Sequence, residues 1–160
     1  MSTANKSLKI LFFTVGSLHL AFNIDVVIKI NKYTSVLGSG LTHYGVTNLG
    51  DREITVIDLH KRLFESSQPR SSQTGGYLLL AKNSVEETFG IVLGQTPTLL
   101  EVSLSQIRVL PESYRQSDTL KIATHVILFT QAEEKLTIFL LDPDELLPVT
   151  LKNEELRIKN

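Results

Sequence analysis

Short apolar stretches alternate with polar turns along most of the chain, and this pattern predicts β-strands. Residues 9–15 and 18–24 are rich in β-branched and aromatic side chains and meet at Gly16-Ser17, a pair that suits a two-residue hairpin turn. Residues 26–30, with the sequence VVIKI, predict the next strand. We therefore expect the first two strands to be antiparallel neighbours.

A strand, turn, strand and helix unit is predicted within residues 43–64, where a polar turn precedes a strand at residues 54–57. Asp58 is the expected N-cap of the helix, because its carboxylate can accept the amides left free in the first turn. Leu59 and Leu63 are four residues apart and so share one face of that helix.

Two further hairpins are predicted later in the chain. Strands at residues 77–81 and 89–93 are joined by a polar segment, and strands at residues 125–130 and 135–141 are separated by QAEEK, which indicates a connection of four or five residues. Residues 65–76 lack large apolar side chains and cannot offset their ordering entropy by burial. This segment predicts a mobile loop between two halves of the chain.

Two short helical turns have recognisable caps. Ser103 and Gln106 have the spacing of a capping box, which predicts a single turn ending at Pro111. Asp142 is the expected N-cap of the next turn, because Pro143 suits the first helical position and Glu145 has the capping-box spacing.

These elements amount to about nine or ten strands at roughly 8–12 residue spacing, which is typical of an all-β barrel or sandwich. Long amphipathic helices do not alternate with the strands, so a parallel α/β fold is disfavoured. A chain of 160 residues can bury a core without disulfides, since domains of roughly 150 residues bury about 70% of their unfolded surface. We expect one globular domain, with two lobes as an option.

Composition narrows the functional classes. The absence of cysteine excludes disulfides and thiolate metal sites and fits a reducing compartment, so we expect a cytoplasmic protein. The 16 basic and 17 acidic residues nearly cancel and are interspersed, which argues against nucleic acid as a partner. No apolar run approaches the roughly 20 residues of a membrane helix, so we expect a soluble chain without membrane insertion.

Candidate chemistry is sparse. The four histidines lack the spacing of metal ligands, and the glycines at positions 38 and 40 lack the rest of a dinucleotide-binding loop. Asp58 and Asp142 are accounted for by helix capping, so neither needs a role as a general base. The sequence thus predicts no catalytic residue, no metal and no cofactor, and the protein is not expected to be an enzyme.

Four segments, taken together, resemble the CheW-like family of chemotaxis signal-transduction adaptors: ILFFTVGSLHLAFNIDVVIKI, YGVTNLGDREITVIDLHKRL, FGIVLGQTPTLLEVSLSQIRVLPE and LTIFLLDPDELL. They occur in the family's order. The resemblance implies an all-β fold of two side-by-side five-stranded SH3-like β-barrel subdomains with a few short helices. It divides the chain into a flexible N-terminus at residues 1–8, a two-lobed CheW-like domain at residues 9–148 and a tail at residues 149–160.

The resemblance also implies an adaptor without catalysis that couples the cytoplasmic tip of a methyl-accepting chemoreceptor to the regulatory domain of a sensor histidine kinase. A receptor-binding apolar groove with a charged rim is expected between the lobes. Carried over position by position, its residues are Val27, Lys29, Gly45, Gly50, Asp51 and Leu99. The alternative is that Val27 and Leu99 are ordinary core residues and that both glycines serve only turns.

This chain departs from the family pattern at the expected site. Lys29 replaces the usual Glu, and Gly50-Asp51 replaces the usual Arg-Gly, which suggests an ion pair between Lys29 and Asp51 with its signs exchanged. The departures favour a divergent array, such as one controlling pilus-driven surface motility. Two alternatives stay open: a degenerate CheW-like domain that regulates by self-association as a homo-oligomer, and a β-barrel enzyme or small-ligand binder with a deep polar cavity.

Overall fold

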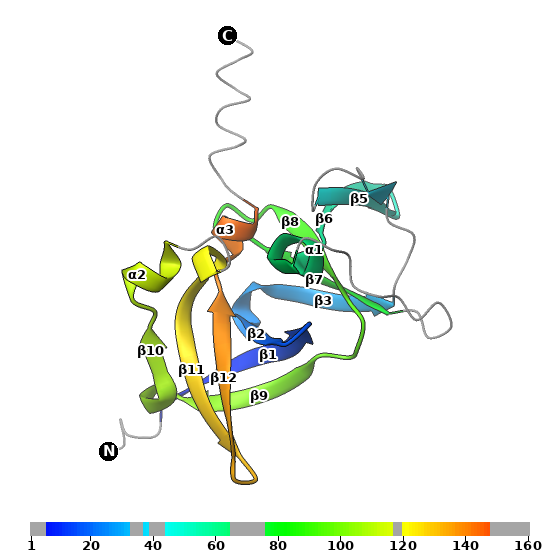
Figure 1. Ribbon diagram of the computed structural model, residues 1–160. Helices are drawn as coiled ribbons and strands as arrows, with labels where there is room; N and C mark the ends of the chain where they lie inside the picture. Colours follow the sequence, from blue (N-terminus) through cyan, green and yellow to red (C-terminus); the bar gives the residue numbers. More distant parts are fainter. Residues whose placement is uncertain (1–5, 33–36, 39–43, 65–75, 117–119, 148–160) are drawn as a thin grey trace.

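The protein, described by a computed structural model, is built of strands with a few short helices (Figure 1). The described residues are 6–32, 37–38, 44–64, 76–116 and 120–147. The strands are β1 (Ser7–Val15), β2 (Leu18–Asn23), β3 (Val27–Lys32), β4 (Leu37–Gly38), β5 (Tyr44–Leu49), β6 (Arg52–Ile57), β7 (Tyr77–Lys82), β8 (Thr88–Leu93), β9 (Thr98–Ser103), β10 (Ile107–Val109), β11 (Ala123–Gln131) and β12 (Glu134–Leu141). The short helical elements are α1 (Leu59–Phe64), α2 (Glu112–Arg115) and α3 (Pro143–Leu146), with 3-10 turns η2 (Ile24–Val26), η3 (Leu104–Gln106) and η4 (Leu120–Ile122). Within the described ranges, no helix has the length and apolar character needed to span a membrane.

The strands form two six-stranded sheets. Sheet A has the order β10-β11-β12-β2-β1-β9, and sheet B has the order β3-β7-β8-β6-β5-β4. Each sheet contains five strands of at least six residues and one shorter edge strand, which is β10 in sheet A and β4 in sheet B. The prediction of an all-β fold in two side-by-side parts is therefore confirmed.

The boundary between the two sheets differs from the prediction. The chain leaves sheet A after β2 and returns to it at β9, so β7 and β8 belong with β3–β6 in sheet B. The prediction of a second half beginning after residues 65–76 was wrong, because long-range pairing fixes which strands share a sheet and loop composition does not. The predicted loop itself, except Gly76, and the predicted tail at residues 149–160 lie outside the described residues, whereas β1 begins at Ser7, within the segment predicted to be flexible.

Apolar side chains pack in three clusters because both faces of each sheet are largely covered. We call the cluster between the sheets the seam core; its buried members are Leu11, Phe13, Val15, Leu20, Phe22, Ile57, Leu59, Leu79, Ala81, Phe89, Ile91, Leu93, Ile122, Leu141 and Leu146. On the other face of sheet A the buried residues are Ile10, Ala21, Val102, Ile127 and Ile138, and on the other face of sheet B they are Ile54, Val56, Leu78 and Leu80. Successive residues of one strand therefore enter different clusters.

Phe22 of sheet A and Phe89 of sheet B make the central contact of the seam core. Both rings are fully buried, and they meet edge-on with their centroids 6.2 Å apart. Phe13 extends the aromatic group within sheet A, with its centroid 5.9 Å from that of Phe22. Such pairs add roughly 0.5–1.5 kcal/mol to the stabilisation from burial alone. The two sheets are thus held together by apolar packing.

Several predicted turns and caps are confirmed. The β1–β2 hairpin turns at Gly16, whose φ of +59° favours glycine and where a Cβ atom would meet the Phe64 ring at 2.7 Å. The amide of Lys61 donates to the Asp58 carboxylate at 3.0 Å. Ser103 and Gln106 form the reciprocal capping box.

Three local predictions need correction. The capped turn ends at Gln106 rather than Pro111, because β10 starts directly after it. The β11–β12 connection is a two-residue turn at Ala132 and Glu133, with φ values of 50° and 70°. Asp142 caps α3, but the capping box with Glu145 is not formed in this described segment, because the Asp142 amide donates to the carbonyl of Ile122 at 2.7 Å.

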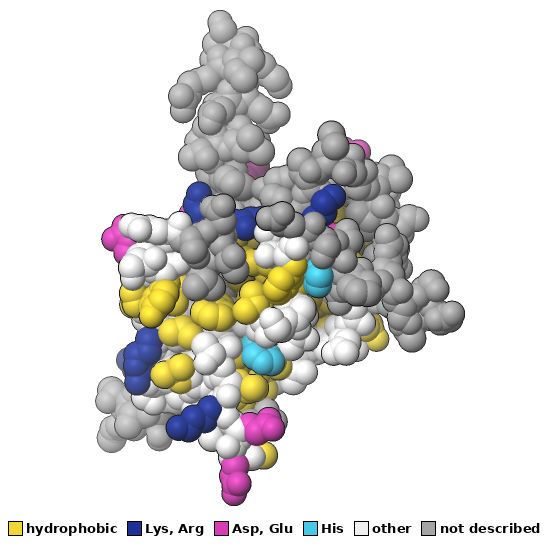
Figure 2. Space-filling view, viewed as in Figure 1, with side chains coloured by type: hydrophobic (Ala, Val, Ile, Leu, Met, Phe, Trp, Pro, Cys, Tyr) yellow, Lys and Arg dark blue, Asp and Glu magenta, His cyan; other side chains and the backbone are white. Residues whose placement is uncertain are grey.

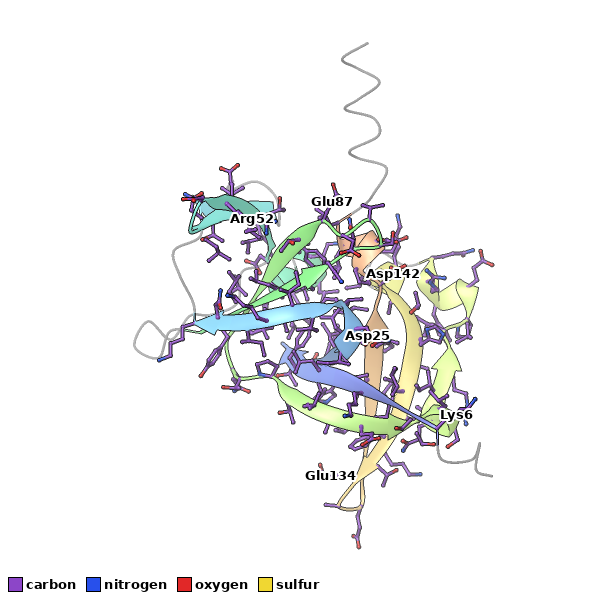
Figure 3. The ribbon with its side chains drawn as sticks, turned by 180° about the vertical axis from the view of Figure 1, so that it is seen from behind. Lys6, Asp25, Arg52, Glu87, Glu134 and Asp142 are labelled. Carbon is purple, nitrogen blue, oxygen red and sulfur yellow. The ribbon has the colours of Figure 1, made fainter. Side chains whose placement is uncertain are left out.

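A buried polar side chain ties the β7–β8 turn to the C-terminal helix α3. Asn83 donates from Nδ2 to Glu87 Oε1 at 2.9 Å and to the carbonyl oxygen of Leu147 at 3.1 Å, and its Oδ1 accepts two amides of its own turn. The amide of Ser84 donates to Asp144 Oδ1 at 2.8 Å. Figure 3 shows Glu87 and Asp142 at the same end of the molecule, where this network, the Asn83 latch, links sheet B to the end of sheet A.

Replacing Ala132 by Asn and Glu133 by Gly should stabilise the protein. Both positions have the left-handed backbone of a type I′ turn, which costs roughly 1–2 kcal/mol for an ordinary residue and is favoured by Asn-Gly. We expect the free energy of unfolding to rise by about 1 kcal/mol in urea titrations. Gly50→Ala, at a φ of +62° with open space around it, is the control and should lower stability. An unchanged or lower stability of the Asn-Gly variant would contradict this interpretation of the turn.

Asn83→Ala should destabilise the fold, because it leaves buried backbone and side-chain groups without partners. We expect a loss of about 2–3 kcal/mol in the free energy of unfolding, measured by chemical denaturation. Ser84→Ala is the matched control, since Ser84 contributes its backbone amide to the latch and its side chain is exposed. It should change stability by less than about 0.5 kcal/mol. If both substitutions lower the free energy of unfolding equally, the hydrogen bonds of the Asn83 latch do not explain the loss.

Candidate protein interface

The seam between the two sheets is closed by its own side chains. The sequence predicted an apolar groove between the lobes, but the facing residues pack against each other and form the seam core. Burying apolar surface contributes roughly 25 cal/mol per Å², so sheets with matching apolar faces close together. The buried residues fill the middle of the seam in the described part of the chain, and the apolar side chains that a partner could contact are the partly exposed ones at its margins.

Leu99 lies at one of these edges, on β9, the edge strand of sheet A. It stands opposite Leu11 in the β1–β9 ladder, and directly opposed residues point to the same face of a sheet. Because Leu11 is buried in the seam core, Leu99 projects on the seam-facing side, yet its side chain is 56% exposed. The alternative that Leu99 is an ordinary core residue is wrong.

The corresponding edge of sheet B is β3, where Val27 stands opposite Ala81 and Ile30 stands opposite Leu79. Both partners are buried in the seam core, so Val27 and Ile30 also face the seam. Val27 is half-buried and packs against the seam core, while Ile30 is 39% exposed. We call Val27, Ile30 and Leu99 the seam rim.

A β-bulge in β3 separates Lys29 from the seam rim. The register shifts between Val27 and Lys29, which leaves Ile28 as the extra residue with 47% exposure. Lys29 stands opposite Leu80, which belongs to the cluster on the other face of sheet B. Lys29 is exposed on that other face, and the sequence pattern missed both Ile28 and Ile30, although each is an apolar residue on an edge strand.

The remaining predicted residues belong to the β5–β6 hairpin. Gly45 lies within β5 opposite Val56 and serves no turn. Gly50 and Asp51 form the two-residue turn, with a positive φ at Gly50 only, as in a type II′ turn. Lys29 and Asp51 are both described, and no ion pair within 4.0 Å joins them. The hypothesis of a sign-exchanged pair is therefore wrong; β7 and β8 lie between β3 and β6 in the sheet.

A second exposed apolar group lies around β10, the other terminal strand of sheet A, and on the elements next to it in the chain or sheet. Its members are Leu104, Val109, Tyr114 and Leu128, of which Val109 is 72% exposed. Figure 2 shows apolar side chains gathered over α2 and β10 and continuing across the adjoining strands. We call these four residues the β10 patch. The sequence analysis did not select these residues, because they come from four different elements and share no local pattern.

Reactive groups do not gather at either surface. Among the described residues, no three His, Cys, Asp or Glu side chains lie where they could share a metal ion. Asp58 and Asp142 accept backbone amides as helix caps. What the described surface offers to another molecule is apolar contact at strand edges, bordered by charged side chains.

Comparison with known proteins agrees with this fold. The crystal structure of the scaffolding protein TtCheW from Thermoanaerobacter tengcongensis superposes with a TM-score of 0.67, covering 89% of this chain and 88% of that chain at 16% identity. This similarity shows a shared fold. A comparison with curated protein sequences gives no significant match.

The family comparison covers most of the sequence. The profile described as "CheW-like domain" matches residues 9–150, which include every described strand from β2 to β12 and nearly all of β1. The matched region contains both sheets, the seam core and both exposed apolar surfaces. The chain therefore belongs to the CheW-like domain family.

Proposed function

We propose that this protein is a non-catalytic adaptor of the chemotaxis type that couples a methyl-accepting chemoreceptor to a sensor histidine kinase in the cytoplasm. The observation that carries the proposal is the seam rim, which leaves Ile30 and Leu99 exposed on the seam-facing edge strands of a CheW-like domain. Protein recognition depends on a few such apolar anchors surrounded by polar contacts. The seam rim has these features without any reactive group.

An adaptor must hold two partners at once, and the geometry supports this. The seam rim includes β9 and the β10 patch includes β10, and these are the two outermost strands of sheet A. The two surfaces consist of different residues, although β9 and β10 are joined by the short turn η3, so variants within each surface can test them separately. We assign the seam rim to the receptor and the β10 patch to the regulatory domain of the kinase.

The positions at which this chain departs from the family pattern bear on the choice of partner. The positions where it departs from the family pattern, Lys29 and Gly50-Asp51, are exposed on sheet B. Surface charges of this kind govern partner choice and association rate more than stability. These departures support a divergent array with its own receptor, such as one controlling pilus-driven surface motility.

Leu99→Asp should weaken binding to the cytoplasmic tip of a receptor from the same genome by at least about tenfold. A carboxylate at a buried apolar contact would lose its hydration, and loss of one anchor commonly costs more than 1 kcal/mol. Binding is measured by biolayer interferometry with purified receptor tips and kinase regulatory domains. The kinase affinity should change less, because Leu99 is not a member of the β10 patch.

Val85→Asp is the matched control, because Val85 is also exposed, lies on the β7–β8 turn and belongs to neither the seam rim nor the β10 patch. Thermal melts verify that both variants are folded. If the folded wild-type protein binds neither class of partner, the adaptor role is rejected. Formation of a stable homo-oligomer in place of both complexes would favour regulation by self-association.

A further inference from the structure

Among the described strands, none pairs with the outer edge of β3. β3 is the terminal strand of sheet B and pairs with β7 on one side only. In an edge strand, alternate residues direct their N–H and C=O groups away from the sheet, where a further strand can satisfy them. Ile28, Lys29, Ile30 and Lys32 are all exposed along this strand, which Figure 3 shows along its full length.

The side chains of β3 restrict which strands can be added. Lys29 and Lys32 are both exposed, and no ion pair to either is found among the described residues. Lysines on a sheet edge disfavour the addition of neutral or basic strands, because each charge would lose water without gaining a partner. Pairing between two copies of β3 would also bring like charges together. An acidic strand converts the same charges into favourable cross-strand pairs.

We propose that β3 accepts an extended acidic segment of a partner protein as an added antiparallel strand. This inference rests on the proposed function, because it names the chemistry of the partner that meets the strand carrying Ile30 of the seam rim. The partner's backbone would pair with the free edge of β3, its apolar side chain would contact Ile30, and its carboxylates would lie beside Lys29 and Lys32. Pairing by β-strand addition combines backbone affinity with side-chain selectivity.

The register of β3 specifies the sequence of the added segment. Ile30 stands opposite Leu79, and Lys32 stands opposite Tyr77, two residues along the same strand, so Ile30 and Lys32 share the seam-facing side. Lys29 lies on the other face. An antiparallel partner therefore needs an acidic residue opposite Lys32, any residue next, an apolar residue opposite Ile30 and an acidic residue opposite Lys29. The expected motif is acidic, any, apolar, acidic.

The test uses two fluorescein-labelled ten-residue peptides that differ only in their central motif, Glu-Thr-Val-Glu or Lys-Thr-Val-Lys. Fluorescence anisotropy with the full-length protein at low ionic strength should show the Glu peptide binding at least about tenfold more tightly. Lys29→Glu combined with Lys32→Glu should reverse this preference. Lys135→Glu, which changes an exposed lysine on β12 of sheet A, is the matched control and should leave it unchanged. Hydrogen exchange should slow at alternate amides of β3 when the Glu peptide is bound.

Equal affinities for the two peptides, or a preference that survives charge reversal on β3, would overturn the inference. Unprotected β3 amides in the peptide complex would overturn strand addition. If charge reversal on β3 leaves receptor binding intact while Leu99→Asp abolishes it, the adaptor role stands and the acidic-strand inference fails. If the Glu peptide binds with the expected preference and no receptor or kinase binds, the inference stands and the adaptor role fails.

Discussion

Packing of Phe22 against Phe89 in the seam core is the interaction on which the architecture depends. Each sheet uses one face for its own cluster and the other face for the seam core, so neither sheet can keep both faces covered without the other. This explains why the apolar runs in β1 and β7 show no alternation with polar residues, since both faces of these strands are buried. We therefore expect the two sheets to unfold together.

The closed seam also determines where the protein can be recognised. Ile30 on β3 and Leu99 on β9 lie on terminal strands, which have a neighbouring strand on one side only, and both side chains are exposed there. The bulge at Ile28 places Val27 and Ile30 on the seam-facing side of β3 and Lys29 on the other face. Buried apolar clusters hold these edge strands in place, so binding a partner requires little further loss of conformational entropy.

Local structure was predictable from the sequence wherever a residue determines the backbone conformation within a few residues of itself, as at Gly16, Asp58 and Ser103. The β11–β12 turn was not, because Ala132 and Glu133 adopt left-handed conformations that residues of their kind seldom take. The boundary between the two sheets was misplaced because the pairs β12–β2 and β6–β8 join segments far apart in the sequence. Leu99 was selected as a site residue through family resemblance, whereas its exposure depends on its place at a sheet edge.

The similarity to TtCheW at 16% identity shows that this fold tolerates wide sequence change. What it requires is apolar volume at the positions that fill three clusters, and many combinations of Leu, Ile, Val and Phe satisfy that requirement. Edge side chains such as Lys29 bear little of this packing, so a change of charge there costs the fold almost nothing. Packing fixes the seam, whereas the charges on the edge strands can change. One fold can therefore acquire new partners while its core is kept.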